Sequence, residues 1–171
     1  LILLIVVGFI GSVLISAIGF SRLSDINKDM RSVMDNTLPS FNTLNNANIN
    51  FLELRLLLRA HVLATDPSVM QALEGQISDK AKELEQGFAE YEKLLSDAQD
   101  EAMYRKVKAN IEEYLKQSQI TLDFSRQNKT ADAVRELAVL ADIAKGVSSS
   151  LAEGVKYNEK LARDLDEKDQ N

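Results

Sequence analysis

The sequence predicts an all-α protein: an antiparallel up-down-up-down four-helix bundle with long first and last helices, preceded by one transmembrane helix. Three observations lead to this fold class. The first 21 residues carry no charge, whereas all 20 Lys and Arg residues and all 26 Asp and Glu residues follow them. Apolar residues then recur at helical spacing along most of the chain. The two Pro and seven Gly residues are too few for the many turns of an all-β chain.

The leading segment 1–21 has the length and composition of a membrane-spanning helix. A helix of about 20 residues is roughly 30 Å long, which matches the hydrocarbon thickness of a bilayer. A signal peptide has a shorter apolar stretch that ends at a small-residue cleavage site. The segment contains only a weak match to such a site, at Ala17, Ile18 and Gly19. Helical periodicity continues beyond these residues. We therefore expect a retained transmembrane helix over 1–21 and an extracytoplasmic domain over 22–171.

The first helix of this domain is expected over about 22–65. Two rows of residues recur along it at intervals of seven, as the a and d positions of a heptad pattern do. The first row is Leu23, Met30, Thr37, Leu44, Phe51 and Leu58, and the second is Ile26, Val33, Ser40, Ala47, Leu54 and His61. The pattern keeps one face of the helix against its neighbours, and Pro39 predicts a bend within it.

Three further helices are expected over about 68–97, 100–127 and 130–170. Asp66 can cap the first of them, and Pro67 suits its first helical position. The turns between the helices are short, so sequential helices become antiparallel neighbours. The long first and last helices extend beyond the others at one end of the bundle, where the membrane helix attaches.

Composition excludes several classes of function. The chain has no Cys, which excludes disulfide scaffolds and zinc fingers, and its single His argues against a histidine-based metal centre. A net charge of −6 argues against nucleic-acid binding, which requires a basic face. No nucleophile–base set and no Glu-x-x-His pair of a di-iron bundle is present. We therefore expect neither catalysis nor a cofactor, and we interpret His61 as a packing residue of the core.

Two stretches carry a family resemblance. Residues 38–67 read LPSFNTLNNANINFLELRLLLRAHVLATDP, and residues 151–171 read LAEGVKYNEKLARDLDEKDQN. Together with the leading apolar helix, they resemble the four-helix-bundle sensor domain of methyl-accepting chemotaxis proteins. The resemblance implies a periplasmic domain of an inner-membrane chemoreceptor that forms a homodimer. It also implies that a small organic acid or amino acid binds near the membrane-distal end, at the dimer interface, and that binding displaces a helix.

The anion sites of this family use arginines on the distal half of the first helix, and the matching residues here are Arg55 and Arg59. They lie four positions apart and therefore share a helix face, so both guanidinium groups can bind one carboxylate. The alternative is that each pairs with a nearby acid such as Glu53. Aspartate-type receptors carry a further arginine about one turn earlier, where this chain has Asn48–Asn50, which argues against aspartate itself as the ligand.

Three more residues complete the predicted binding site. Asn48 lies one heptad before Arg55 on the same stripe. Antiparallel counting from the distal turns brings Thr121 and Arg135 level with Arg59. Their alternative roles are a surface threonine and an arginine paired with Glu136 or Asp132.

Two other functions share these features. A sensor kinase can carry the same extracytoplasmic bundle, and a membrane-anchored coiled-coil scaffold can bind only proteins. The sequence leaves open which small molecule binds, and whether it binds directly or through a binding protein.

Overall fold

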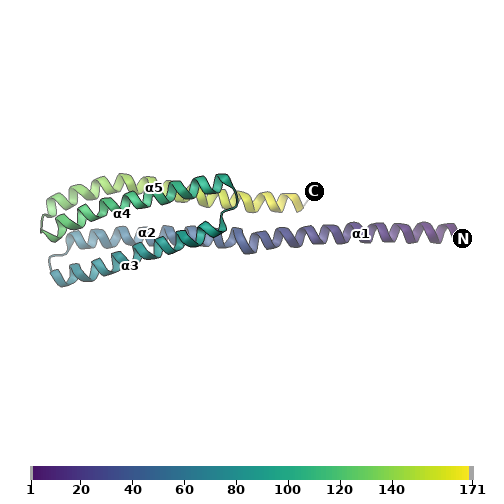
Figure 1. Cartoon of the computed structure of the whole chain (residues 1–171), viewed down its shortest axis with the longest axis horizontal. Helices are drawn as coiled ribbons and strands as arrows, with labels where there is room; N and C mark the ends of the chain where they lie inside the picture. The colour runs from purple at the N-terminus through teal and green to yellow at the C-terminus, as the bar shows by residue number, and fades with distance from the viewer. Residues whose placement is uncertain (1, 170–171) are drawn as a thin grey trace.

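The computed structural model describes the backbone of residues 2–169 and the side chains of residues 8–9, 11–13 and 15–164. The predicted all-α four-helix bundle is confirmed (Figure 1). The elements in chain order are α1 (Ile2–Ser32), a π-helix (Val33–Thr37), α2 (Leu38–Leu63), α3 (Pro67–Tyr91), a short 3-10 helix (Glu92–Leu94), α4 (Ala98–Arg126) and α5 (Thr130–Asp169).

The predicted membrane helix lies within α1, which is one continuous α-helix over Ile2–Ser32. In the described part of the chain, no helix combines the length and the apolarity needed to cross a membrane. Within the segment 1–21, the side chains of residues 1–7, 10 and 14 lie outside the described residues.

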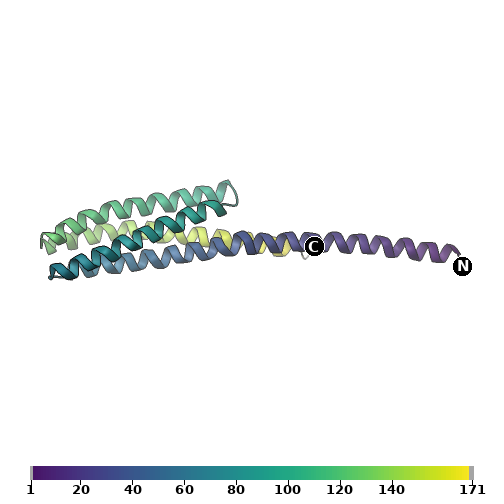
Figure 2. The same ribbon diagram turned by 60° about the horizontal axis from the view of Figure 1, so that its bottom comes forward.

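The helices pair into two antiparallel hairpins, α2 with α3 and α4 with α5, and α2 also packs along α5 (Figure 1, Figure 2). The α2–α3 and α4–α5 turns lie together at one end, which we call the distal end. The α3–α4 loop lies at the opposite, proximal end. There α1 continues outward with the last turns of α5 beside it, and its N-terminal part projects alone (Figure 1).

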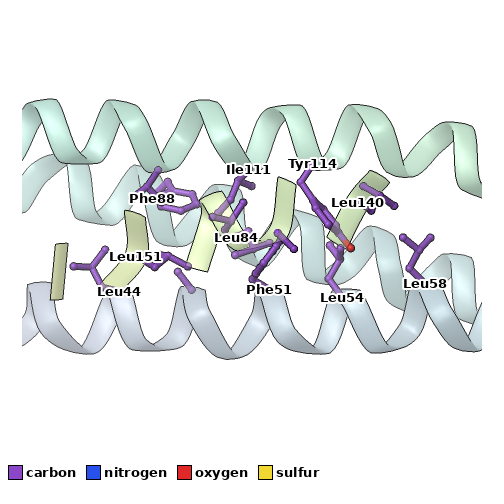
Figure 3. Packing of buried hydrophobic residues seen from close by; sticks show 14 of the residues in the cluster. Leu44, Phe51, Leu54, Leu58, Leu84, Phe88, Ile111, Tyr114, Leu140 and Leu151 are labelled. Atoms are coloured by element: carbon purple, nitrogen blue, oxygen red, sulfur yellow. The ribbon is translucent and has the colours of Figure 1, made fainter. Parts of the chain in front are cut away.

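The buried row of α2 joins the bundle together. Its members are Ser40, Leu44, Ala47, Phe51, Leu54, Leu58 and His61, and Thr37 of the π-helix continues the row. Leu84 and Phe88 of α3 and Leu140 and Leu151 of α5 meet this row in one apolar cluster (Figure 3). Each fully buried Leu or Phe side chain contributes about 1.5–3 kcal/mol to the stability of the fold, relative to an exposed one. The heptad pattern therefore accounts for the packing of α2 along its whole length.

The same pattern does not stay buried on α1, contrary to the sequence-based prediction. Leu23, Ile26 and Met30 are 58%, 41% and 58% exposed. Leu23 and Ile26 lie beyond the point where two of the four helices, α3 and α4, end beside the π-helix. At that point Asn36 Nδ2 donates to the carbonyl oxygen of Leu94 in the α3–α4 loop at 2.9 Å. Beyond this point only α5 accompanies α1.

A π-helix stands where the sequence predicts a bend near Pro39. The Leu38 N–H donates to the Val33 carbonyl oxygen, five residues earlier in the chain. In a regular α-helix the ring of Pro39 would clash with the carbonyl of Asp35, and no N–H would be present to bond it. The wider turn before the proline avoids this clash, so the rod continues to Leu63 without a break.

The distal turns follow their predicted local chemistry. Asp66 caps α3 by accepting from the Ser68 N–H at 2.7 Å, and Pro67 begins that helix. Asn128, between α4 and α5, has a left-handed φ of 57°, which Asn adopts more readily than most residues.

The proximal loop differs from the prediction, because α3 ends at Tyr91 rather than near residue 97. Asp97 begins α4 by accepting from the N–H groups of Gln99 at 2.8 Å and Asp100 at 2.9 Å. The buried Asp100 carboxylate then accepts from the Tyr91 hydroxyl at 2.6 Å and from the Ser96 N–H at 3.0 Å. These bonds turn the chain before the predicted helix is complete.

One polar core residue offers a test of the packing. Thr121 of α4 is fully buried, and its hydroxyl oxygen has no hydrogen-bond partner. A buried unsatisfied hydroxyl costs about 1–3 kcal/mol. Thr121→Val is therefore expected to raise the Tm measured by circular dichroism by about 2–6 °C. Ser125→Ala is the control: its hydroxyl donates to the His61 carbonyl oxygen at 3.0 Å, so this variant is expected to lower the Tm. Equal losses in both variants would contradict the assignment of Thr121.

Candidate functional site

Arg55 and Arg59 stand on α2 one helical turn apart, each directly after a core leucine, Leu54 and Leu58. Arg55 is half-buried, and its guanidinium carbon lies 5.7 Å from the centre of the Phe51 ring. Arg59 is exposed. The core row thus fixes the backbone of both arginines, while their charged ends lie at the edge of the bundle and reach solvent.

The expected acidic partner of these arginines is engaged elsewhere. Glu53 pairs with Lys80 of α3 at 2.9 Å. Among the residues that the structure describes, neither Arg55 nor Arg59 has a carboxylate within ion-pair distance. Two adjacent positive charges therefore lack a counter-charge, and an added anion would find free donors there.

Tyr114 of α4 lies close to both arginines, a placement that the sequence does not reveal. Its ring packs edge-on against Phe51, with the ring centres 4.8 Å apart, and points from α4 toward α2 (Figure 3). Burial raises the pKa of the Tyr114 phenol to about 12, while the charges of Arg55 and Arg59 act to lower it. At neutral pH the hydroxyl therefore keeps its proton, and the Tyr114 side chain, 2% exposed, is part of the core next to Phe51.

The other predicted site residues are placed less favourably. Asn48 is half-buried on α2, one heptad from Arg55. Thr121 is sealed inside the core, so a ligand could touch its hydroxyl only if the helices separated. Arg135 points to solvent from α5 and pairs with Asp132 at 2.7 Å, which is the alternative role weighed from the sequence.

A second apolar row runs along α2 beside the arginines. We call it the α2 stripe; it consists of Ile49, Leu52, Leu56 and Leu63, with exposed fractions from 43% to 76%. Arg59 lies on this stripe too, seven residues after Leu52 and between Leu56 and Leu63. The patch is therefore an open helix face, and a bound anion would be enclosed only by a further surface.

A polar cluster cross-links α2, α3 and α4 at the distal end. His61, fully buried, lies 2.9 Å from Ser125 Oγ through Nδ1 and 3.0 Å from Glu74 Oε1 through Nε2. Glu74 also accepts two bonds from the Arg126 guanidinium, at 2.8 and 3.0 Å. Those bonds hold the pKa of the Glu74 carboxyl below its usual value, against the smaller opposing effect of burial.

This cluster contains the serine, histidine and carboxylate order of a hydrolytic triad. Both Ser125 and His61 are closed off from solvent, however, and the Ser125 hydroxyl donates its proton to the His61 carbonyl oxygen. A nucleophile must meet its substrate, so the cluster acts as a structural cross-link. The sequence predicts the burial of His61 from its heptad position but not its partners, which come from other helices.

Within the described residues, no group of three His, Cys, Asp or Glu side chains gathers closely enough to hold a metal ion. The carboxylates of the bundle instead form ion pairs, many of them between residues three or four apart on one helix.

Fold and site together define an extended helical bundle that continues through a single helix at its proximal end, an arrangement suited to transmitting a displacement. The whole chain, residues 1–171, matches the family model of a four helix bundle sensory module for signal transduction, and the chain belongs to that family. The resemblance to the sensor domain of methyl-accepting chemotaxis proteins is thereby confirmed. No curated protein matches the sequence.

The distal cluster predicts a specific acid sensitivity. Because the pKa of Glu74 is lower in the folded state, the stability that it contributes is complete above its unfolded pKa of about 4.5 and is lost as the pH falls through the lower folded value. Glu74→Gln is expected to lower the urea midpoint at pH 7, since Arg126 and His61 lose their charged acceptor, and to flatten the decline in stability below pH 5.

The matched control is Glu90→Gln, because Glu90 is exposed on the same helix and forms no ion pair among the described residues. Its urea midpoints from pH 7 to pH 3 are expected to follow those of the parent chain. A Glu74→Gln profile parallel to the parent would show that the carboxylate contributes nothing to acid sensitivity.

Proposed function

We propose that this chain is the sensor domain of a bacterial transmembrane chemoreceptor, anchored in the inner membrane through residues 1–21 and with residues 22–171 in the periplasm. Its family is a sensory module for signal transduction, which supports the role of sensor. The proposal adds a ligand class, a small organic acid or an amino acid, and a signalling unit, the homodimer.

The observation that carries the ligand class is the uncompensated pair Arg55 and Arg59. Two guanidinium groups one turn apart offer parallel donors to the two oxygens of a carboxylate. Asn48 continues the polar edge of α2 toward the proximal end. The Tyr114 hydroxyl on the opposite hairpin is 2% exposed and would become a further donor only if the helices separated. Thr121 and Arg135 are left outside the proposed site, since the core and Asp132 already hold them.

The α2 stripe supports a second copy of the chain as the surface that encloses the ligand. Leu52, Leu56 and Leu63 are large apolar side chains that face solvent on one side of one helix. Their heptad spacing is that of a helix–helix seam. In a two-fold dimer the same stripe meets itself, which brings Arg59 of each copy to the interface.

Ligand binding can act on signalling only if one arrangement of the helices binds the ligand better than another. Arg55 and Arg59 lie on the rod that continues into α1, and Tyr114 lies on the hairpin that ends in α5. A carboxylate held between them would bias the position of one rod relative to the other, by the 1–2 Å typical of helix shifts at interfaces.

A thermal-shift screen of the full chain in detergent tests the ligand class, with dicarboxylates, tricarboxylates, aromatic acids and amino acids as probes. A ligand at about one hundred times its Kd adds roughly 2.7 kcal/mol, which raises the Tm by about 5–10 °C for a domain of this size. Arg59→Ala is expected to weaken binding of the hit by about 10–100-fold, since charge-assisted hydrogen bonds contribute about 1.5–3 kcal/mol.

Arg105→Ala is the control, because Arg105 is an exposed arginine paired with Glu101 at 2.6 Å on α4. It is expected to bind the hit as the parent does. A hit whose affinity survives both Arg55→Ala and Arg59→Ala would remove the proposed site, and a flat screen would favour sensing through a binding protein or a scaffold role.

Light scattering of the full chain in detergent tests the dimer. Leu56→Glu places a charge on the α2 stripe and is expected to yield a monomer where the parent yields a dimer, because a buried unpaired carboxylate costs several kcal/mol. Ile120→Glu adds the same charge at an apolar residue of α4 that is 43% exposed, and is expected to leave the dimer intact. If Ile120→Glu alone breaks the dimer, the interface lies on another face.

A further inference from the structure

The π-helix holds one more residue in its turn than an α-helix does. Its bond from the Leu38 N–H to the Val33 carbonyl oxygen spans five residues, where an α-helix spans four. One residue of an α-helix corresponds to about 100° of rotation and about 1.5 Å of rise. The π-helix therefore sets the rotation and height of α1 relative to α2.

The heptad pattern of the sequence runs through this segment as if no residue were added. Thr37 and Ser40, just after it, take their core positions and are buried. Met30 and Ile26, one and two turns before it, belong to the same rows but are exposed, whereas Asp29 is half-buried. Asp29 is thus turned toward the bundle in place of Met30, as one added residue predicts, while Val33 of the π-helix itself keeps its heptad position and is half-buried.

Contacts with the proximal loop favour the observed arrangement. Asn36 Nδ2 donates to the Leu94 carbonyl oxygen at 2.9 Å, and Ser96 Oγ donates to Asn36 Oδ1 at 3.2 Å. The same loop is bonded to α5, because the Tyr157 hydroxyl donates to Asp97. We call Asn36, Leu94, Ser96, Asp97 and Tyr157 the proximal clamp. The clamp ties the π-helix to α5 through the loop.

We propose that residues 33–37 are a register switch between two positions of α1. In the π register, seen here, the proximal clamp holds Asn36 and Asp29 faces inward. In the α register the segment becomes regular α-helix, Asn36 leaves the loop, and α1 turns by about 100° and moves by about 1.5 Å. That motion turns Met30 toward α5. The inference rests on the proposed function only for the signal that the switch would carry.

The two registers have opposing advantages, which keeps both accessible. The α register turns the exposed Met30 toward α5, whose half-buried Leu161 borders the same cleft as Ser32. The π register keeps the bonds of Asn36 and avoids the clash between Pro39 and the carbonyl four residues before it. The displacement has the size of the helix shifts by which proteins switch.

Deletion of a single residue tests whether the π-helix contains one residue more than a regular α-helix would at this place. Removing Asp35, an exposed residue of the segment, is expected to give a continuous α-helix with both flanking faces in place, and a Tm within about 2 °C of the parent. Removing Asn46, an exposed residue of α2, shifts the core row by one position and is expected to lower the Tm by more than about 10 °C. Equal losses in the two deletions would overturn the proposal.

Disulfide trapping in the full chain measures the register directly, and the absence of native Cys makes each engineered pair unambiguous. Ser32 and Asp164 line one cleft of about 360 Å³ beside Asn36. Ser32→Cys with Asp164→Cys is expected to oxidise readily in the π register. Val33→Cys with Asp164→Cys is expected to do so only in the α register, in which Val33 takes the place of Ser32.

Asn36→Ala removes the clamp and is expected to raise the yield of the Val33→Cys/Asp164→Cys product about tenfold relative to the other pair, since two hydrogen bonds favour the π register. Asn27→Ala is the control, because Asn27 bonds only within α1, to the Leu23 carbonyl oxygen at 2.9 Å. An unchanged product ratio in Asn36→Ala would show that α1 has one register.

These experiments use no ligand, so they can fail or succeed independently of the carboxylate screen. If the register changes but no probe binds, the proposed binding site is wrong and the register switch stands. If a probe binds but the product ratio shows a single register, the signal must reach the membrane by another movement of the helices.

Discussion

The burial of one face of α2 is the contact on which the other helices depend. Phe51, Leu54 and Leu58 are fully enclosed, and the apolar cluster around them draws residues from α3, α4 and α5. Because this row repeats every seven residues, α2 stays against its neighbours for its full length. The outer side of the same helix is then free to carry the α2 stripe and the arginines. A single helix thus forms the core on one face and the candidate site on another.

Polar clusters at the two ends determine how the hairpins are aligned. At the distal end His61 joins Ser125 and Glu74, and at the proximal end Asn158 Nδ2 donates to the Tyr91 hydroxyl at 2.8 Å. Apolar heptads tolerate sliding by whole turns, whereas a buried polar group that loses its partner bears the full cost of desolvation. These clusters therefore select one alignment among several that the apolar row would allow.

The candidate site and the π-helix lie on the same continuous rod, at opposite ends of α2. Arg55 and Arg59 provide positive charge at the distal half, and Asn36 meets the α3–α4 loop at the proximal end. A packed core resists deformation, so a change at one end of α2 reaches the other as movement of the whole helix. The rod that would sense the ligand is thus the rod whose register the proximal clamp holds.

The sequence by itself determined the features that depend on neighbours along the chain. Heptad spacing predicts the core row of α2 and the burial of His61, and Asp66 with Pro67 predicts the first turn, because capping and periodicity act within a few residues. Only the tertiary structure decided which residues from separate helices meet. It brought Tyr114 beside the arginines, gave His61 its partners, and ended α3 early through Asp100. It also gave the bend that Pro39 predicts the form of a π-helix, since the bonds of Asn36 to a loop 58 residues away have no local signature.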